Sequence, residues 1–480
     1  MDTAICPIRT TTVGGASRLT SDTGRVSHYD LAVIGTGSGN SIVDHRFAGQ
    51  RVAIVEKGRF GGTCLNVGCI PTKMFVYPAD LERYAGHGPA LGVGTRPGPA
   101  DWRAIRDRIF GRIDPIADSG EEYRRALPDI DVYDGTCRFT GHRTIDSGTG
   151  VEITADQIVI AAGTRPWIPD IPGLDTVTHH TSDTVMRIDA LPERVGIVGG
   201  GFIGAEFAHV FSSYGAQVTQ IHRGDVLLGK EDADVAARFT ALAGRQWEVM
   251  LGTTVDGVKP VGDGVRLELS SGETQDVDVL LLATGRTPNS DLLGLDAAGV
   301  EVDDDGFVLV DEYQRTTAPG VWALGDVSSP LQLKHLANQD ARVVQHNLLH
   351  PKSLQVSDHR CVPSAVFSSP QVAKVGLTEQ EARDLGVDVA VSTQDYGGVA
   401  YGWAMEDRDH FAKLVADRAT GALVGAHLIG PQASILVQPL VQAMSFGQPV
   451  AGLARGQYWI HPALAEVVEN ALLALEEQLS

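Results

Sequence analysis

Short apolar runs rich in β-branched residues recur along the chain, and several of them stop on a glycine. Four such runs, each with its closing glycine, are Asp30–Gly35, Ile158–Gly163, Arg194–Gly199 and Val277–Gly285. Runs of this length and composition predict buried strands of an α/β fold. A strand that delivers a glycine turn into a helix is the first half of a dinucleotide-binding unit. Because this design occurs twice in the same order, we predict two such units in one chain.

The first unit starts at Tyr29, where we expect ordered structure to begin. Its glycine turn, GTGSGN from Gly35 to Asn40, is expected to open a helix whose N-terminus receives a pyrophosphate. Asn40 stands where a third small residue is usual. The second strand, Arg51–Val55, ends on Glu56, 21 residues beyond Gly35, where a carboxylate can accept hydrogen bonds from a ribose.

The second unit has full glycine spacing in GGGFIGAE, Gly199 to Glu206. Its second strand, Gln217–Ile221, is followed by His222 and Arg223, with no carboxylate at the ribose position. A cation there suits a 2′-phosphate, so the expected ligand is NADPH rather than NADH. The alternative is that Arg223 is a solvated surface charge.

Two cysteines lie five positions apart in GGTCLNVGCIPTK, after a glycine-rich turn and before an apolar run that is typical of a helix. A helix N-terminus stabilises a thiolate, so at least one of Cys64 and Cys69 is expected to be acidic and nucleophilic. Two thiols this close can form a disulfide if the backbone brings their Cα atoms within roughly 7 Å. The pattern favours a redox-active dithiol, with two buried unreactive thiols as the alternative.

Neither a structural disulfide nor a metal site is expected at this pair. Nothing else in the chain is typical of a secreted protein, where structural disulfides are common. A zinc site needs about four ligands, and the next cysteine, Cys137, is distant in sequence and has no neighbouring cysteine.

Composition narrows the class of protein further. The 480 residues, 43% of them apolar, suggest about three domains. The formal net charge of −21 argues against nucleic acid and anionic membranes as partners. Five cysteines, an odd number with one close pair, fit a reducing compartment, and we expect the cytoplasm. Residues 1–27, which include Cys6, lack an apolar signal region, so we expect a disordered extension and a soluble protein without a membrane span.

From about Cys361 the pattern changes to alternating strands and turns, with a helix predicted over Gln432–Met444. A second helix ends the chain, and Pro462 is expected in its first turn. His461 and Glu466 lie five positions apart around this start. Taken alone, a histidine at such a place favours a capping or core role, with a catalytic role as the alternative.

Together these motifs resemble the disulfide reductase family of pyridine-nucleotide flavoenzymes, over nearly the whole chain from Tyr29 onward. The matching segments, in order, are GGTCLNVGCIPTK, GGGFIGAE, ATGRTPN (283–289), ALGD (323–326) and HPALAE. The resemblance implies an α/β fold with two Rossmann-like domains, for FAD and NADPH, and a C-terminal α+β dimerisation domain. The implied domains are an FAD-binding domain in two parts (28–165 and 291–355), an NADPH-binding domain (166–290) and a dimerisation domain (356–480).

The same resemblance implies which residues bind the cofactors. For FAD they are Gly35, Gly37, Ser38, Gly39, Glu56, Lys57, Gly62, Thr63, Cys64, Lys73, Cys137, Ala162, Gly163, Gly325, Asp326 and His335. For NADPH they are Gly199, Gly201, Phe202, Ile203, Gly204, Glu206, His222, Arg223 and Gly285. Phe202 stands where the family places an aromatic gate over the flavin, and Asp326 would hold the ribityl side of FAD.

The catalytic residues implied by the resemblance are Cys64, Cys69, Lys73, Glu206, His461 and Glu466. Cys64 would be the outer, interchange thiol and Cys69 the inner thiol against the flavin. Lys73 and Glu206 would pair beside flavin N5. The histidine, oriented by the last glutamate, would act as acid–base across a homodimer interface, so that the active site needs both subunits.

The implied substrate is a low-molecular-weight disulfide, reduced with electrons that pass from NADPH through FAD and the dithiol. GTGSGNSIVDHRF near the front and QYWIHPALAEVVENALL at the end most resemble the branch of the family that reduces the disulfide of mycothiol, a largely uncharged cysteinyl sugar conjugate. Arg46 is the candidate cation of the substrate pocket.

Other members of the family are weighed against this branch. Glutathione reductase is the nearest rival. His222 and Arg223 argue against an NAD-dependent dihydrolipoamide dehydrogenase, and residues 471–480 lack the cysteine pair of a mercuric reductase. A flavin-binding redox sensor that does not turn over is the alternative from a different class.

Overall fold

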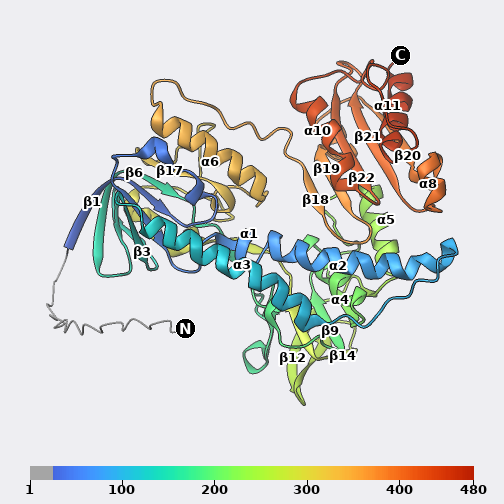
Figure 1. The fold of residues 1–480 in the computed structure, drawn as a ribbon, viewed down its shortest axis with the longest axis horizontal. Helices are drawn as coiled ribbons and strands as arrows, with labels where there is room; N and C mark the ends of the chain where they lie inside the picture. The colour runs from blue at the N-terminus through green and yellow to red at the C-terminus, as the bar shows by residue number, and fades with distance from the viewer. Residues whose placement is uncertain (1–24) are drawn as a thin grey trace, which may run out of the picture.

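A mixed, mainly parallel sheet built on strand β1 (Arg25–Ile34) forms the first domain of the computed structural model, which describes residues 25–480 (Figure 1). β1 pairs along its length with β6 (Val151–Ile160), starting with Arg25 opposite Val151. Ordered structure therefore begins before Tyr29, because residues 25–27 of the expected extension continue the ladder with β6. Residues 1–24, including Cys6, lie outside the described residues.

The sheet of this first domain has seven strands. Besides β1 and β6 they are β2 (Val52–Glu56), β3 (Ile130–Asp134), β4 (Arg138–Gly141), β5 (Thr144–Asp146) and β17 (Val321–Ala323). The order is β3-β2-β1-β6-β5-β4, and β17 also pairs with β6. Because successive strand side chains point to opposite faces, Leu31 and Val33 join one buried cluster while Ala32 and Ile34 join another. The later elements β17 and α6 (Lys334–Leu349) return to this sheet.

The glycine turn after β1 does not open a helix, which corrects the expectation from GTGSGN. Only two 3-10 turns, Gly39–Ser41 and His45–Phe47, separate β1 from β2. The buried Arg124 guanidinium donates to the carbonyl oxygens of Asn40 (2.6 Å) and Val43 (2.8 Å), and Gln345 donates to that of Ile42 (2.5 Å). These are oxygens that an α-helix would use internally, so contacts from distant helices replace the helical ladder.

The helices that follow β2 are α1 (Gly62–Asn66), α2 (Cys69–His87) and α3 (Trp102–Arg125). α2 contacts all three domains. It begins beside α1, packs along α4 (Phe202–Ser213) of the second domain, and ends where His87 Nε2 lies 3.4 Å from the Met405 carbonyl oxygen of the third. Asp80 of α2 bonds the fully buried His209 of α4 at 2.8 Å.

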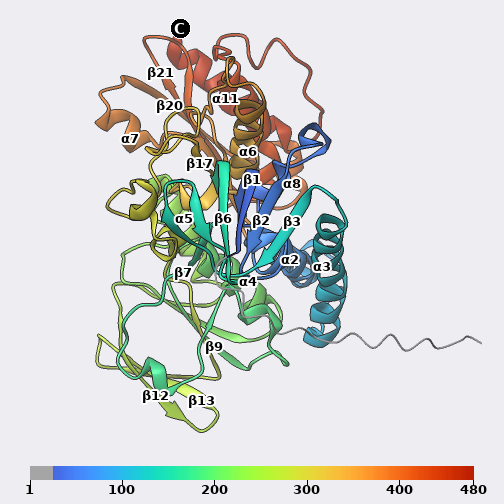
Figure 2. The ribbon, with the colours of Figure 1, turned by 90° about the vertical axis from the view of Figure 1, so that its left-hand side faces the viewer.

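The second domain repeats the first one's central strand order. Its parallel strands are β8 (His180–Thr181), β9 (Arg194–Val198), β10 (Gln217–Ile221), β11 (Glu248–Met250) and β15 (Val279–Leu282), in the order β11-β10-β9-β15-β8. Here the glycine turn does lead into a regular helix, α4, and α5 (Ala233–Ala243) follows β10. A three-stranded sheet, β12 (Val255–Val261), β13 (Gly264–Leu269) and β14 (Thr274–Val277), extends this domain at the bottom of Figures 1 and 2. The ribbon of β7 (Thr164–Pro166) and β16 (Arg286–Pro288) links the first and second domains.

An antiparallel sheet forms the core of the third domain, at the top of Figure 2. Its strands are β18 (Ser364–Val366), β19 (Val372–Gly376), β20 (Val389–Asp395), β21 (Phe411–Asp417) and β22 (Leu423–Ile429), in the order β18-β19-β22-β21-β20. Its helices are α7 (Glu379–Asp384), α8 (Ala400–Ala404), α9 (Ala433–Leu436), α10 (Gln438–Ser445) and α11 (Ala465–Leu479).

Both helices expected near the end of the chain differ in detail. The helix expected over Gln432–Met444 is divided into α9 and α10, with Pro439, which has no N–H to donate, in the first turn of α10. The last helix begins at Ala465 rather than around Pro462. Glu466, the second residue of this helix, accepts the Ala463 N–H at 3.0 Å and so ties the preceding turn to the helix start.

No helix between residues 25 and 480 is long and apolar enough to cross a membrane.

Candidate active site

A disulfide joins Cys64, in α1, to Cys69, the first residue of α2. Their Cα atoms are 4.8 Å apart because the chain turns back through Gly68 between the two helices. A Cβ atom on Gly68 would lie 2.8 Å from the Thr63 carbonyl oxygen, so the turn requires glycine. Cys69 stands at the N-terminus of a 19-residue helix, whose free N–H groups and dipole stabilise a thiolate there.

The cysteines of this disulfide reach the protein surface, which disfavours the alternative of two buried thiols. Cys69 is exposed and Cys64 is half-buried. In the described part of the chain the remaining cysteines, Cys137 and Cys361, are free. Burial raises the pKa of the Cys137 thiol to about 12, so it is inert at neutral pH.

Lys73, one turn beyond Cys69, bridges the first two domains through Glu206 of α4. Its Nζ lies 2.7 Å from both carboxylate oxygens of Glu206, whose side chain is only 4% exposed. Glu206 also accepts the Phe367 backbone N–H at 2.9 Å, and the ammonium lies 4.8 Å from the centre of the Phe367 ring. The structure thus brings together a pair of side chains 133 positions apart at the junction of the two dinucleotide-binding units.

A cavity of about 660 Å³ opens beside Cys69. The residues that line it with Cys69 are Ile70, Lys73, Met74, Tyr77, Arg108, Arg112 and Phe367. Arg46, expected as the pocket cation, is elsewhere, because its guanidinium bonds Asp44 and Gln345. The cations of this cavity besides Lys73 come from α3, where Arg108 and Arg112 are one turn apart and carried no recognisable motif.

The first glycine turn and the dithiol segment are packed against each other. Gly35 has φ +99°, and a Cβ there would lie 2.3 Å from the Ala161 carbonyl oxygen. A Cβ on Gly62 would lie 2.7 Å from the Gly37 Cα, so the segment that carries Cys64 touches the turn backbone to backbone.

Glu56 holds this turn in place from the end of β2. One carboxylate oxygen accepts from the Thr36 N–H (2.8 Å) and hydroxyl (2.7 Å), and the other accepts from the Gly58 N–H at 2.9 Å. Lys57, the next residue, is exposed. Cys137 is enclosed in the core below the sheet, so only its backbone could meet a cofactor.

A second set of groups faces the same turn from the later part of the first domain. Asp326 follows β17, and burial raises the pKa of its carboxyl; Gly325 before it has φ +74°. Lys334 donates to the Ser38 hydroxyl at 2.8 Å, and Ser38 donates to Asn338 at 3.1 Å. Burial lowers the pKa of Lys334.

His335, expected from the sequence at the FAD site, and its neighbour Lys334 make different contacts. His335 is exposed and its Nε2 donates to the Pro363 carbonyl oxygen at 2.8 Å. Each step along a helix turns the side chain by about 100°, so Lys334 and Asn338, a helical turn apart, face Ser38 while His335 does not. That i, i+4 spacing of polar side chains is the signal that could have found them.

The second glycine turn has open space where a dinucleotide would lie. Gly199 has φ +131° and Gly204 packs on it, since a Cβ on Gly204 would lie 2.5 Å from the Gly199 carbonyl oxygen. In contrast, a Cβ on Gly201 or Gly285 would meet no heavy atom within 4 Å. Phe202, at the start of α4, has 48% of its surface exposed, and Ile203 beside it is half-buried.

The ribose position of the second unit carries no carboxylate. The His222 ring lies against Gly200, where a Cβ would be 2.5 Å from it. Burial, with Arg223 as a lesser cause, lowers the pKa of His222, so this ring is neutral at neutral pH. Arg223 is exposed and makes no hydrogen bond or ion pair with any of residues 25–480.

His461 and Glu466 form a bonded pair before and inside α11. His461 Nδ1 lies 2.7 Å from a Glu466 oxygen, and this hydrogen bond lowers the pKa of the Glu466 carboxyl. The His461 side chain is 71% exposed. Figures 1 and 2 both show α11 at the end of the molecule farthest from β12, well away from the start of α2.

Both glycine turns fit a dinucleotide. At each turn the glycines either pack where no side chain fits or border open space, and the backbone N–H groups at the start of α4 can receive a pyrophosphate. The first turn adds the carboxylate of Glu56, which suits a ribose, and the Lys334 cation beside Ser38, which suits a phosphate. The second turn offers an arginine in place of the acid, as a 2′-phosphate requires.

Two dinucleotide-binding units joined at a surface disulfide define a pyridine-nucleotide disulfide oxidoreductase, and comparisons with known proteins agree. Residues 29–341 match the family model of pyridine nucleotide-disulphide oxidoreductases, and residues 362–472 match the dimerisation domain of that family. The chain therefore belongs to the pyridine nucleotide-disulphide oxidoreductase family.

Particular relatives narrow the family further. Mycothione reductase of Mycobacterium tuberculosis (strain H37Rv) is 56% identical over 93% of this chain and 99% of its own length. Glutathione reductase of Burkholderia cepacia is 32% identical over 91% of this chain and 97% of its own. The solved structure of the flavoprotein disulfide reductase RclA from Escherichia coli, 29% identical, superposes with a TM-score of 0.82 over 93% of this chain and 99% of that one.

These findings support four of the sequence-based predictions. The fold class is α/β with two dinucleotide-binding domains and a C-terminal domain. The chain is an oxidoreductase that reduces disulfides with NADPH, and its cofactors are FAD and NADPH. The dimerisation domain indicates a homodimer.

Proposed function

We propose that this enzyme reduces mycothiol disulfide through Cys64 and Cys69, with His461 of the partner subunit as acid–base. The observation that carries the proposal is the Cys64–Cys69 disulfide at the N-terminus of α2, one helical turn from the Lys73–Glu206 pair that joins the two dinucleotide-binding units. The cofactor-binding residues are those named from the sequence, together with Lys334 and Asn338.

The first glycine turn, Glu56 and Lys334 would hold FAD, which would supply the electron transfer between NADPH and the Cys64–Cys69 disulfide. Lys73 places a positive charge one turn from Cys69, and Glu206 holds that ammonium through two 2.7 Å bonds. The α2 N-terminus and this ammonium stabilise the Cys69 thiolate that cleavage produces.

Cys64 then exchanges with the substrate. Its thiolate attacks one sulfur of the disulfide, forms a mixed disulfide and expels the first product as a thiolate. The partner subunit's His461 gives that thiolate a proton, and Glu466 fixes the ring through its Nδ1 at 2.7 Å. Attack of the Cys69 thiolate on Cys64 restores the internal disulfide and expels the second product.

The position of His461 in the fold is the reason for assigning this residue to the partner subunit's contribution to the active site. The side chain is 71% exposed and precedes α11, which lies well away from the start of α2 in Figure 1, whereas a homodimer can bring His461 of one subunit to the dithiol of the other. Mixed dimers test this: Cys64→Ser and His461→Ala subunits, each inactive alone, should form heterodimers with one complete site. No recovery of activity on mixing would overturn the shared site.

The identity of 56% to mycothione reductase supports the mycothiol substrate. One observation favours a charged disulfide such as that of glutathione, namely Arg108 and Arg112 in the cavity beside Cys69. We also place the enzyme in the cytoplasm, because a thiol regenerated at every turnover needs a reducing compartment.

The decisive experiment is NADPH oxidation by the purified holoenzyme with mycothiol disulfide, glutathione disulfide and lipoamide side by side. We expect kcat/KM for mycothiol disulfide to exceed the others by at least about 100-fold, a difference of about 2.7 kcal/mol. Cys64→Ser should still take up NADPH equivalents without reducing any disulfide, and Cys361→Ser, a change at a free cysteine, is the matched control that should behave as wild type. Uptake that ends after one equivalent in the wild type would indicate a sensor instead of an enzyme.

A further inference from the structure

Three basic side chains form a row across the third-domain sheet. The register places Lys374 of β19 opposite His427 of β22, and His427 opposite Lys413 of β21. Directly opposite residues of antiparallel strands point to the same face, so the row lies on one face of the sheet. That face meets residues 230–234 of the second domain, at the start of α5.

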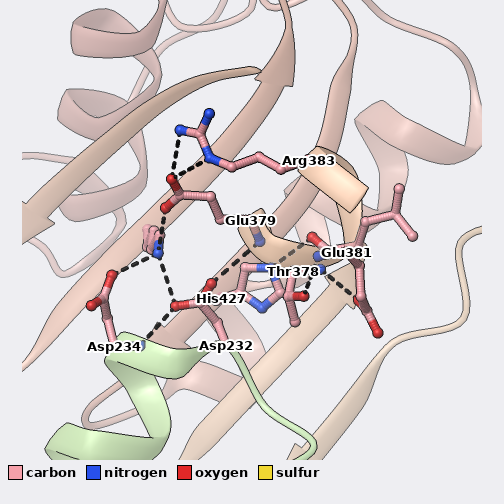
Figure 3. A network of polar contacts seen from close by, with 9 residues as sticks. Asp232, Asp234, Thr378, Glu379, Glu381, Arg383 and His427 are labelled. Atoms are coloured by element: carbon pink, nitrogen blue, oxygen red, sulfur yellow. Dashed lines mark hydrogen bonds and ion pairs between the residues drawn. The ribbon is translucent and has the colours of Figure 1, made fainter. Parts of the chain in front are cut away.

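The segment that faces the row is acidic. Lys413 Nζ lies 3.0 Å from Asp232, 2.6 Å from Asp234 and 2.8 Å from Glu379 of α7, and these carboxylates converge on the amine in Figure 3. Lys374 donates to the Lys230 carbonyl oxygen at 2.5 Å and lies 3.2 Å from Glu231. Two lysines of the third domain, Lys374 and Lys413, therefore bind one short segment of the second domain, residues 230–234.

The ion pair between Lys413 and Asp232 is buried. The side chains of Lys413 and Asp232 are 4% and 2% exposed. Burial alone would lower the pKa of Lys413, but hydrogen bonds to Asp234, Glu379 and Asp232 outweigh it and raise the pKa, so the lysine stays charged. Removing one partner of such a cluster leaves buried charge uncompensated.

His427 is a neutral spacer between the lysines. Burial lowers its pKa, its Nε2 donates to the Leu377 carbonyl oxygen at 2.9 Å, and its Nδ1 is buried without a partner among the described residues.

Residues 230–234 also connect to the second glycine turn, where NADPH is expected to bind. They end a loop that begins at His222, whose ring lies against Gly200. Within the loop the Leu228 N–H donates to the Gly200 carbonyl oxygen at 2.7 Å. Leu228 has φ +54°, a left-handed conformation that a leucine keeps only where neighbouring contacts enforce it. The loop is thus pressed onto the second glycine turn and fixed at its far end by Lys374 and Lys413.

We propose that Lys413 and Lys374 are positioning residues for NADPH: by anchoring residues 230–234 they hold the loop from His222 to Leu228 against Gly200 and shape the site for the adenosine 2′-phosphate. This inference rests on the proposed NADPH site at Gly199–Glu206, His222 and Arg223. The third domain then supports NADPH binding in addition to forming the dimer.

The test is Lys413→Met in the full-length holoenzyme. The dissociation constants of NADPH and of adenosine 2′,5′-bisphosphate should both rise about tenfold, within the range usual for coupled sites. KM for NADPH should follow, while kcat at saturating NADPH and KM for the disulfide stay within about twofold. The matched control is Lys259→Met. It removes an exposed lysine of the second domain that pairs with Glu268, and it should change none of these values.

Peripheral changes keep the proposal testable if Lys413→Met does not fold. Asp234→Asn removes a carboxylate at the exposed rim of the cluster and should raise the NADPH dissociation constant about threefold. A folded Lys413→Met or Asp234→Asn enzyme that binds both ligands as wild type would overturn the inference. If the wild type itself fails to bind adenosine 2′,5′-bisphosphate, the proposed NADPH site is wrong instead.

Discussion

The two dinucleotide-binding units share a strand order but differ in what supports their glycine turns. β3-β2-β1-β6 in the first corresponds to β11-β10-β9-β15 in the second. After the glycines, the second unit continues into α4, a 12-residue helix with eight buried residues that satisfies its own backbone. The first unit breaks into 3-10 turns whose carbonyl oxygens are bonded by Arg124 and Gln345 from outside.

The difference shows that a glycine fingerprint specifies a turn and that the following residues decide whether a helix grows from it. FIGAEFAHVFSS buries eight of its residues in the core between the first and second domains, and that packing stabilises the helix. NSIVDHRF offers β-branched residues and Asp44, whose side chain accepts the Arg46 N–H at 2.9 Å and starts a short turn instead. The backbone after the first glycine turn is therefore held by side chains from distant parts of the domain, whereas the backbone after the second turn is held by the hydrogen bonds of its own helix.

Removing the outside support should give the largest effect. Arg124→Met deletes three hydrogen bonds of a buried guanidinium and leaves the Asn40 and Val43 carbonyls without donors. We expect the free energy of unfolding to fall by about 3 kcal/mol, with loss of FAD on gel filtration. Arg125→Met, which removes an exposed arginine paired with Glu121 and Asp134, is the control and should cost less than about 1 kcal/mol. If the two changes lowered the stability equally, Arg124 would not stabilise the segment after the first glycine turn.

The locally built turn should respond to packing. Gly204→Ala puts a Cβ 2.5 Å from the Gly199 carbonyl oxygen and 2.9 Å from Gln220 Nε2, and overpacking of this kind costs about 2 kcal/mol. Gly201→Ala enters open space, so chemical denaturation should find its stability unchanged. Its KM for NADPH should nevertheless rise about tenfold, because the methyl group occupies the path of the pyrophosphate. A stable Gly201→Ala enzyme with normal KM would place the nucleotide elsewhere.

The acid of the first unit has no counterpart in the second. Glu56→Gln keeps the shape but turns an amide NH₂ toward either the Thr36 or the Gly58 donors. Leaving a donor without an acceptor should cost about 1–2 kcal/mol by chemical denaturation and weaken FAD binding. His222→Gln at the matching position of the second unit should change stability by less than about 0.5 kcal/mol. A larger loss at His222 than at Glu56 would reverse the comparison.

The smallest effect is expected at Arg223, an exposed residue whose side chain makes no hydrogen bond or ion pair within residues 25–480. Arg223→Ala should leave stability within about 0.5 kcal/mol of wild type. Loss of one exposed contact to the 2′-phosphate, worth about 1 kcal/mol, should raise KM for NADPH about fivefold and spare NADH. If the ratio of NADPH to NADH turnover does not change, the phosphate is recognised by another residue.

Much of this arrangement could be predicted from local sequence. The strands, both glycine turns, and the cysteine pair depend on residues within a few positions of one another, and the structure has them where the pattern puts them. The Lys73–Glu206 and His461–Glu466 contacts came from the resemblance alone, and the coordinates bring each pair to 2.7 Å.

The rest depends on partners far apart in the chain. The residues after Gly35 disfavour a helix, but the contacts that replace its backbone hydrogen bonds come from Arg124, 84 positions from Asn40, and from Gln345, 303 positions from Ile42. No periodicity in the first 60 residues carries that information. His335 stays a prediction, whereas the Lys334 contact with Ser38 could not be foreseen, since the phase of α6 was not visible before the sheet that it faces was known.

The reach of α2 has a consequence for how this chain can change. A helix rises about 1.5 Å and rotates about 100° per residue, so its length and phase are set together. Inserting one residue between Lys73 and Asp80 would swing Asp80 away from His209 and move His87 off Met405, with the sulfurs left in place. The length of α2 between Lys73 and Asp80 is therefore coupled to the contacts between domains, whereas a change in length of the loop from Gly92 to Ala100 would leave those contacts in place.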